Sequence, residues 1–483
     1  MRIAPIALTA CALACAVGCR TTKDVLDDYE RNMTAGNYAA LPGEPAELAA
    51  KGDDSSLLWH LLAGGGFYLA DAKADALRHF DAAEDAMQKN DATSVFAQGA
   101  TGGLAMMTND RAFPYGGGGQ DRIFACLYKA VDYMCAGKTG PARTELNRAA
   151  QHQENWIWER RKDVEAAAAR MDKDADAYAA QQQAQPEGDR AQQTAGVLAD
   201  ASFAAQVREK CAFDPALSGN LATLTAADYM NAYVQHVCGV FRWLDGGGGR
   251  NFLKDAATLA PASAAARDFA EADKGLKPRN QVWIWAEDGL CPAREEWRID
   301  LPLVLLPYAG RYVLYAGMAL PYLRPRDMGA TTWQVQAGGV TTPFAESANM
   351  DKLLKTEYDV YMRGALTREI TRTVVKTGVQ IALGVAADNS GDSRHQLAMR
   401  LAQAGVAAWA ASTTAADLRS WTALPKTVKC VRIDRPADGR LDVLADNQRI
   451  QLAVPEGNTL VFLRKPSPQA MPVVKQVTFT ARR

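Results

Sequence analysis

The feature of this sequence that most constrains its fold is a change of hydrophobic pattern near residue 276. Before this point, apolar and small residues recur at helical spacing, as in LLWHLLAGGGFYLADAKADALRHFDAAEDAM. After it, short runs of β-branched and aromatic residues alternate with polar ones, as in NQVWIWAED and EWRIDLPL. We therefore predict an α+β fold, with a helical domain at residues 56–275 and a mixed sheet and helix domain at residues 276–483.

The helical domain contains a weak internal repeat. Small and aromatic residues take matching positions in two segments, where Ala76 and Ala142 lie 66 residues apart (142 − 76), about two periods of a tetratricopeptide-type repeat. A looser third copy follows at residues 229–261. These copies predict tetratricopeptide-like helix pairs, with a plain irregular bundle as the alternative. A Gln-rich linker is predicted within the domain at about residues 180–200.

Three glycine runs occur in the helical domain, in LAGGGF, YGGGGQ and LDGGGG. None is followed by Lys-Ser or Lys-Thr, and none follows a predicted strand, so they do not match the P-loop that binds nucleotide phosphates. The runs predict helix ends and loops instead.

The N-terminus predicts the cellular compartment. MRIAPIALTACALACAVGC carries one early charge, Arg2, and no other charge precedes Arg20. This pattern is typical of a cleaved signal sequence, here residues 1–18. Its end resembles a bacterial lipobox, which predicts that Cys19 is acylated, palmitate included, and becomes the first residue of the mature chain. An ordinary secretory signal is the alternative, and residues 19–55 are predicted to form a tether with one short helix.

The composition limits the classes of partner and cofactor. The formal net charge of −1 argues against nucleic-acid binding. Six cysteines follow the lipobox, and an even number in an oxidising compartment permits disulfides without fixing their pairing. Because the sequence has no CxxC spacing and its histidines are scattered, we expect no metal site and no cofactor. The six cysteines are Cys126, Cys135, Cys211, Cys238, Cys291 and Cys430.

Cys291, in the segment EDGLCPAREEW at residues 287–297, is a candidate nucleophile. A catalytic thiol needs a base, and only His395 is expected in the same region of the chain. Pro292 directly after the cysteine suits a turn better than a nucleophile. We therefore predict no catalytic residue here. The alternative is a cell-wall hydrolase or modifying enzyme that uses residues 287–300.

The charged residues of the same segment are candidates for contact with a partner. Glu287, Asp288 and Glu295 are of the type that forms a paired-carboxylate site. Adjacent acids on a strand, however, point to opposite faces of the sheet. Glu-Asp-Gly and Pro-Ala-Arg are typical turn sequences, so we predict a solvated connection in which Arg294 pairs with the nearby acids.

Two further groups complete the candidate interaction residues. Arg368, Arg372 and Lys376 are spaced by four and share one face of a predicted helix. This stripe has the charge to contact anionic lipid, cell-wall phosphate or an acidic partner, although a solvated face is the default expectation. Arg419 and Trp421, in ADLRSWTALP, are predicted to dock the helical region onto the sheet.

The order of these parts resembles a family of uncharacterised bacterial outer-membrane lipoproteins with tetratricopeptide-like helical repeats. The resemblance rests on the lipobox at Cys19, on RIFACLYKAVDY (122–133), on VWIWAEDGLCPAREEWRIDLPL (282–303) and on ADLRSWTALP (416–425). It implies a role in the envelope, in association with cell-wall assembly, but no defined activity.

These patterns together lead to an expected function. We expect a protein anchored in the outer membrane by its acyl chains and facing the periplasm, since Arg20 rather than aspartate follows Cys19. It would act as a scaffold or binding module whose concave helical surface holds a peptide or protein partner in the envelope. A structural subunit of an envelope complex is a further alternative.

Overall fold

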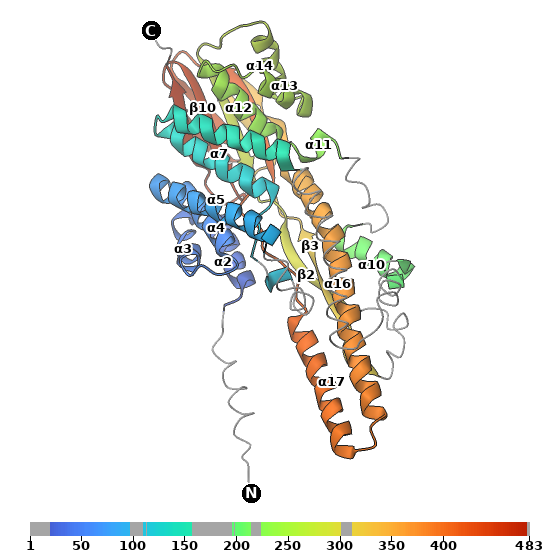
Figure 1. Cartoon of the computed structure of the whole chain (residues 1–483). Coiled ribbons are helices and arrows are strands. Elements are labelled where there is room, and N and C mark those ends of the chain that lie inside the picture. The colour runs from blue at the N-terminus through green and yellow to red at the C-terminus, as the bar shows by residue number, and fades with distance from the viewer. Residues whose placement is uncertain are drawn as a thin grey trace.

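The computed structural model describes residues 20–96, 110–112, 114–156, 196–197, 199–213, 224–300 and 312–480. It is a mixed α+β protein in which the first part of the chain is helical and the sheets follow (Figure 1), as the change of pattern predicts. The predicted signal sequence, Cys19 and most of the predicted linker at 180–200 lie outside the described residues.

Residues 19–55 were predicted to form a tether with one short helix. The short helix is present within α2 (Thr22–Ala35), but residues 22–49 belong to the folded body and do not form a tether. They fold into α2, η2 (Tyr38–Ala40) and α3 (Gly43–Ala49). Thr21 caps the N-terminus of α2. The apolar residues Val25, Tyr29 and Met33 of this helix recur every four positions and enter the main hydrophobic core. This periodic apolar face makes the segment part of the folded body.

The glycine run in LAGGGF lies inside α4 (Ser56–Leu69), not at a helix end as predicted. The helix packs so closely that a Cβ on Gly64 would meet the ring of Phe80 at 2.8 Å, and one on Gly65 would lie 3.2 Å from Trp421. Close approach therefore explains this run. The other two runs lie in loops, before residue 119 and between residues 246 and 249, as predicted.

Each predicted repeat segment contains two consecutive helices. The first pair is α4 with α5 (Lys73–Phe96), and the second is α7 (Gly119–Cys135) with a helix at residues 139–156. The third pair is α12 (Ala232–Leu244) with α13 (Arg250–Leu259). The other helices described in this part are α10 (Ala201–Cys211), α11 (Ala226–Tyr229) and α14 (Ala264–Asp273), with the short turn η4 (Asp110–Ala112).

The strands form three sheets. A five-stranded sheet has the order β11-β10-β1-β7-β6, a four-stranded sheet the order β5-β4-β8-β9, and β2 pairs with β3. β1 runs parallel to β10, whereas the other pairs are antiparallel. The strands are β1 (Gln281–Asp288), β2 (Ala293–Asp300), β3 (Gly317–Arg324), β4 (Trp333–Ala337), β5 (Val340–Pro343), β6 (Ala345–Asn349), β7 (Thr427–Asp434), β8 (Arg440–Ala445), β9 (Gln448–Ala453), β10 (Asn458–Lys465) and β11 (Val473–Phe479).

The five-stranded sheet lies between the helices and the four-stranded sheet. Alternation along β1 shows this: Trp283 and Trp285 join the core shared with α4, α5, α7 and α12, whereas Val282 and Ile284 join the core shared with β4, β8 and β9. Because the main core includes residues from both halves of the chain, the helical part and the sheet part form one body.

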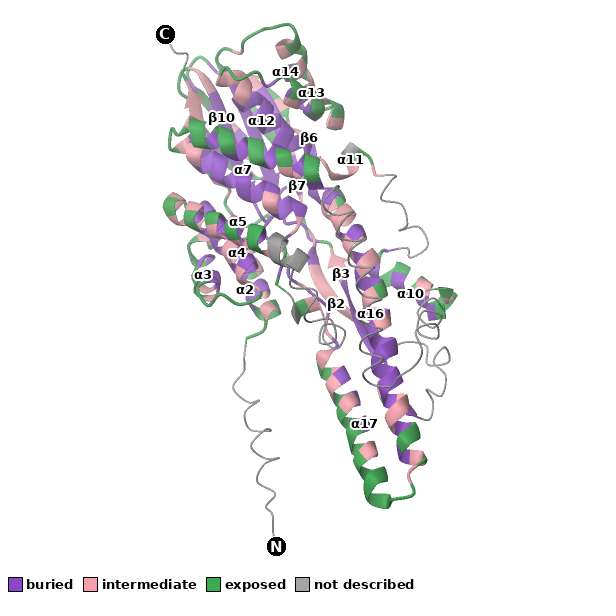
Figure 2. Ribbon diagram, viewed as in Figure 1, coloured by how far each residue is buried: buried purple, intermediate pink, exposed green. Residues whose placement is uncertain are grey.

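A separate layer is built on α16 (Met350–Asp388), which packs along β3. Beyond this contact α16 continues into a hairpin with α17 (Ser393–Thr413) that projects from the body (Figure 1). Much of α17 is exposed (Figure 2). Within the described ranges, no helix combines the length and the apolar character needed to cross a bilayer.

Candidate functional site

The segment 287–297 connects two different sheets. It leaves β1 of the five-stranded sheet and enters β2, which pairs with β3. The Gly289 N–H donates to the carbonyl of Lys465 at 2.9 Å, and the Cys291 N–H donates to that of Leu424 at 2.9 Å. The connection is therefore enclosed, and the prediction of a solvated turn is wrong at Glu287 and Asp288, which are 3% and 0% exposed.

Glu287 faces the helices and its carboxylate is fully partnered. Tyr128 of α7 donates its hydroxyl hydrogen to Oε2 at 2.9 Å, and Tyr233 of α12 donates to Oε1 at 2.9 Å. Arg464 on β10 places Nε 3.8 Å away. Burial raises the pKa of Glu287, against the effects of Arg464 and both tyrosines. The small gap beside these side chains, which Lys475 also lines, has no room for a water molecule.

Asp288 points to the opposite face, as two adjacent acids on a strand are predicted to do. Its carboxylate accepts from the Ala330 N–H at 2.8 Å and lies 3.5 Å from Lys429 Nζ. Burial raises the pKa of Asp288, and Lys429 opposes this shift. Because Glu287 and Asp288 lie in different layers, they do not form a paired-carboxylate site.

Cys291 contacts backbone carbonyls and Arg326. Its Sγ lies 3.9 Å from the carbonyl oxygens of Trp421 and Thr422 and 3.7 Å from Arg326 Nη2. His395, the one base expected near it, is exposed at the start of α17. Burial raises the pKa of the thiol, and a protonated thiol is a poor nucleophile. Nothing in these contacts supports a nucleophilic role for Cys291.

The basic stripe of α16 is largely enclosed, not solvated as the default expectation held: Arg372 and Lys376 are buried, and Arg368 is partly buried. Asp110, from η4, accepts from Arg368 at 2.7 Å and from Arg372 at 2.8 Å. Arg419 pairs with Asp417 at 2.8 Å and also donates to the Asp110 carbonyl at 3.1 Å. Although burial opposes it, the two α16 guanidinium groups lower the pKa of Asp110. An acid distant in sequence thus converts a predicted surface stripe into an internal contact.

Lys376, the last residue of the stripe, joins α16 to α17. Its ammonium donates to Thr413 Oγ1 at 3.0 Å and lies 5.1 Å from the ring centre of Trp409. Burial lowers the pKa of Lys376 to about 8. Its role is to stabilise the base of the hairpin.

Arg294 and Glu295 do not pair with each other, contrary to the predicted local pairing. Arg294 lies over the ring of Tyr361 at 4.8 Å and donates to the Arg419 carbonyl at 3.4 Å. Glu295 accepts from Tyr322 at 2.5 Å and from Arg324 at 2.5 Å, both on the paired strand β3. Neighbouring strand residues point to opposite faces, so their partners differ.

A cysteine, a histidine and an aspartate also meet in the main core. His236 Nε2 lies 2.6 Å from Asp268, and Cys430 Sγ lies 3.8 Å from His236 Nδ1. The order resembles a nucleophile–base–acid triad, but Trp285 already donates its indole N–H to Nδ1 at 3.2 Å. Cys430, His236 and Asp268 are at most 1% exposed. We interpret this set as a hydrogen-bonded part of the core.

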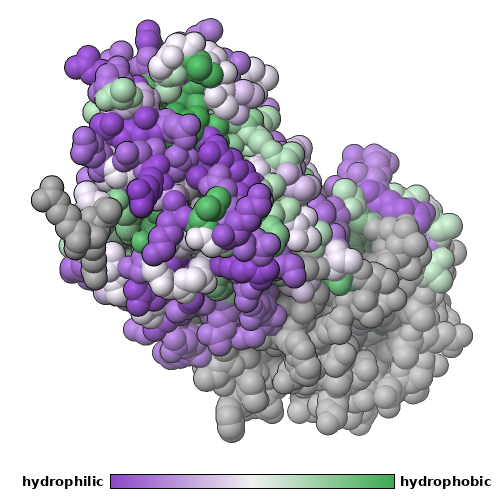
Figure 3. All heavy atoms as spheres, turned by 90° about the horizontal axis from the view of Figure 1, so that it is seen from above, coloured by the Kyte–Doolittle hydropathy of each residue, from purple (hydrophilic) through white to green (hydrophobic). Residues whose placement is uncertain are grey.

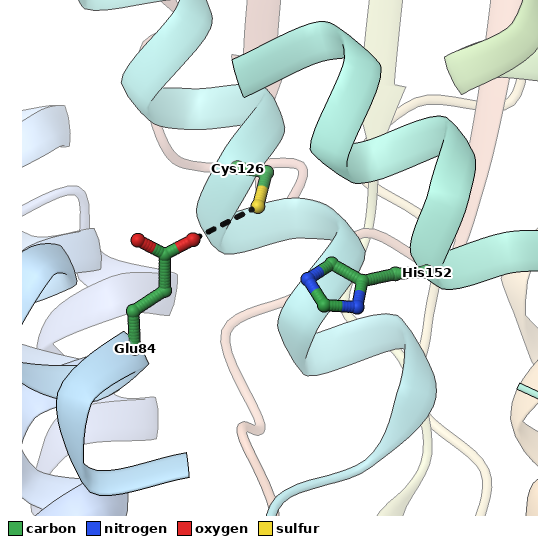
Figure 4. A group of neighbouring side chains, drawn as sticks. All are labelled: Glu84, Cys126 and His152. Carbon is green, nitrogen blue, oxygen red and sulfur yellow. Dashed lines mark hydrogen bonds between the residues drawn. The ribbon is translucent and has the colours of Figure 1, made fainter. Parts of the chain in front are cut away.

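Glu84, Cys126 and His152 form a further group that the sequence analysis did not identify (Figure 4). Their potential ligand atoms all lie within 4.8 Å of one another. The three residues come from α5, α7 and the helix at 139–156, so their spacing in sequence gives no signal.

All six cysteines after the predicted lipobox are free thiols, which answers the question of their pairing.

The exposed apolar surface of the hairpin is the other feature missed. Leu397 and Leu401 are 61% and 64% exposed, and Ala404 and Ala408 continue the same face of α17. We call these four residues the α17 seam. The opposite face of α17, with Val406, Ala407 and Ala410, packs on α16. The seam's spacing is visible in the sequence, but its exposure depends on which face α16 covers.

Comparison with known proteins gives no relative on which a function could rest: no family model, curated protein or solved structure matches the chain.

Proposed function

We propose that the chain is a lipid-anchored envelope protein that acts as a scaffold or binding module, and that its partner protein binds along the α17 seam. The observation that carries the proposal is an exposed apolar helix face on a projecting hairpin. The lipobox pattern at Cys19 supports the anchor and the placement at the periplasmic side of the outer membrane.

The α17 seam has the geometry of a helix-binding surface. Its residues are separated by four, three and four positions, which is the a/d spacing of a coiled-coil interface. Leucines at one end and alanines at the other allow a second helix to approach closely at the alanine end. The partner is therefore expected to present an apolar helix face. Two exposed leucines and two exposed alanines thus share one helix face, and exposed apolar surface gathered on one face is a mark of interaction sites in soluble domains.

The opposite end of the molecule has a different character. Seen from above, its described surface is mostly hydrophilic, with hydrophobic residues in small groups (Figure 3). The helix pairs with small residues at their contacts, such as Gly64 against Phe80, support the interpretation as tetratricopeptide-like repeats. In this proposal they stabilise the body that presents the hairpin.

The enzyme alternative has less support. Glu287, Asp288 and Cys291 are buried and occupied by partners from their own chain. A hydrolytic site needs acids that converge on a space where substrate can bind. Here the carboxylates of Glu287 and Asp288 point into separate layers.

The double substitution Leu397→Asp with Leu401→Asp is expected to abolish the cellular function of the protein while leaving it folded. Both side chains are exposed, so the change in unfolding free energy should stay within about 0.5 kcal/mol. Complementation of a deletion strain measures function, and circular dichroism measures folding. The matched control is Leu276→Asp, because Leu276 is 53% exposed but lies outside the hairpin.

The opposite pattern of lost and retained function among the variants would favour the enzyme alternative. A folded Cys291→Ala protein that loses function, beside a Leu397→Asp/Leu401→Asp protein that keeps it, would contradict the scaffold proposal. Isolation of the envelope complex distinguishes the structural-subunit alternative. Deleting a structural subunit would disassemble the complex, whereas substitutions in the α17 seam of a scaffold would release a single partner protein.

Replacing Cys19 with serine is expected to move the protein from the membrane fraction to the soluble periplasmic fraction. Serine cannot form the thioether to the lipid, and stable anchoring needs that attachment. Incorporation of labelled palmitate, followed by fractionation, measures the change; Cys15→Ser is the control and should keep both label and location. Equal labelling of Cys19→Ser and the wild type would refute the anchor.

A further inference from the structure

We propose that Glu84, Cys126 and His152 bind a divalent cation, and that Zn²⁺ is the ion whose preferences they fit. The site is independent of the scaffold function. A carboxylate, a thiolate and an imidazole are the ligand types that Zn²⁺ takes in proteins. Three protein ligands leave a fourth coordination position for water or another ligand, as in open zinc sites.

The three side chains already converge. Cys126 Sγ lies 3.5 Å from Glu84 Oε1, and the ring of His152 points toward both (Figure 4). All three ligand atoms lie within 4.8 Å of one another. Around a tetrahedral Zn²⁺ such atoms are separated by roughly 3.5 Å, so small side-chain rotations suffice. Cys126 is buried, whereas Glu84 and His152 are partly exposed, which gives an ion a route from solvent.

The charges around the group favour a cation. Lys129 lies 2.7 Å from Asp81, 2.9 Å from Glu84 and 3.2 Å from Glu145, and Arg148 lies 3.1 Å from Glu84. Three carboxylates thus face two side-chain cations, and Glu145 Oε2 is buried without a hydrogen-bond donor. With Cys126 as thiolate, the excess is two negative charges. A divalent ion neutralises this excess.

Lys129 and Cys126 contact different oxygens of the Glu84 carboxylate. Lys129 bonds to Glu84 Oε2, while the oxygen facing Cys126 is Oε1. Arg148 reaches both oxygens, but its side chain is 46% exposed and is free to withdraw into solvent. Binding then exchanges one proton for the ion: the Cys126 thiol releases its hydrogen as H⁺ to water while sulfur bonds to the metal.

The test uses Co²⁺ as a spectroscopic substitute for Zn²⁺ on the purified full chain after chelator treatment. We expect one Co²⁺ per chain, displacement by Zn²⁺, and a thiolate-to-cobalt charge-transfer band in the near ultraviolet. Cys126→Ser should remove the band and weaken Co²⁺ binding by about 100-fold. Losing a direct ligand should cost at least as much affinity as losing a residue that only orients a ligand. Cys135→Ser, on the same helix, is the matched control and should change neither.

Two further variants keep the test decisive if Cys126→Ser does not fold. Glu84→Gln and His152→Gln should each weaken Co²⁺ binding at least about tenfold while leaving the circular dichroism spectrum unchanged. The proposal is wrong if the protein binds no Co²⁺, if the charge-transfer band survives Cys126→Ser, or if folded Glu84→Gln and His152→Gln bind as the wild type does. None of these results would alter the outcome expected for the α17 seam.

Discussion

Replacing Arg464 with methionine is expected to lower the free energy of unfolding by about 3–5 kcal/mol. Arg464 is 3% exposed, and it donates to the carbonyl oxygens of Gly289 at 2.7 Å and Ala423 at 2.8 Å. It is also the cation beside the buried carboxylate of Glu287. Methionine fills a similar volume, but it leaves the Glu287 carboxylate with its two tyrosine donors and no nearby cation, and it removes the Arg464 donors from both carbonyls. Urea unfolding followed by tryptophan fluorescence measures the loss.

The loss should depend on pH with a definite sign. Burial raises the pKa of Glu287, and Arg464 opposes this shift. Without Arg464 the folded-state pKa rises further above the unfolded value, so the folded variant favours the protonated acid. The contribution of the protonated Glu287 to the stability of the variant is present at low pH and is lost as the pH rises through the folded-state pKa. The deficit of Arg464→Met is therefore larger at about pH 8 than at about pH 5.

An exposed ion pair provides the control for this prediction. Arg449 pairs with Asp442 on the surface of the four-stranded sheet, and its side chain is 59% exposed. Arg449→Met should cost much less than Arg464→Met, because solvent screens an exposed ion pair. Equal losses for the Arg464 and Arg449 variants, or a loss from Arg464→Met that does not vary with pH, would contradict the buried pairing of Arg464 with Glu287.

Replacing Trp421 with alanine is expected to cost about 3–5 kcal/mol, because it opens a cavity where three parts of the chain meet. Trp421 is 2% exposed, and its ring centre lies 5.8 Å from that of Phe80 and 5.9 Å from that of Tyr128. It also lies against Gly65, inside α4. The same unfolding measurement gives the magnitude. Trp421→Phe keeps much of the contact and should cost clearly less.

The size of this loss tests the predicted docking role of the ADLRSWTALP segment. If Trp421→Ala costs under about 1 kcal/mol, the segment does not hold the helices against the sheet. A loss in the expected range, with the Phe variant intermediate, would support the docking role that the sequence predicted for Trp421.

Local patterns predicted most of the secondary structure. Strands β1 and β2 form where NQVWIWAED and EWRIDLPL show β-branched and aromatic residues, and the change of pattern near residue 276 separates the helices from the sheets. The prediction that the glycine run of α4 marks a helix end or loop is wrong because helix ends and close helix contacts both favour glycine. Only the neighbouring side chains, such as Phe80 against Gly64, separate the two.

The candidate site was less predictable, because its character depends on partners far away in the sequence. Charge and turn composition indicated a solvated segment around Glu287, yet its carboxylate meets Tyr128 and Tyr233, from two helices of the preceding region. The same holds for Arg368 and Arg372, which form ion pairs with Asp110. A pattern on one strand or helix does not reveal which element will cover it.

The most direct test of the proposed function is site-specific photocrosslinking in cells at position 401. We predict one discrete crosslinked product between this position and an envelope protein, identified by mass spectrometry, and its loss when Leu397→Asp is added. Purified partner should then bind the purified wild-type protein and not the variant. A probe at position 276 is the control and should give no such product. Absence of a product at position 401, or a product consisting only of a second copy of this chain, would contradict the binding of a partner protein to the α17 seam.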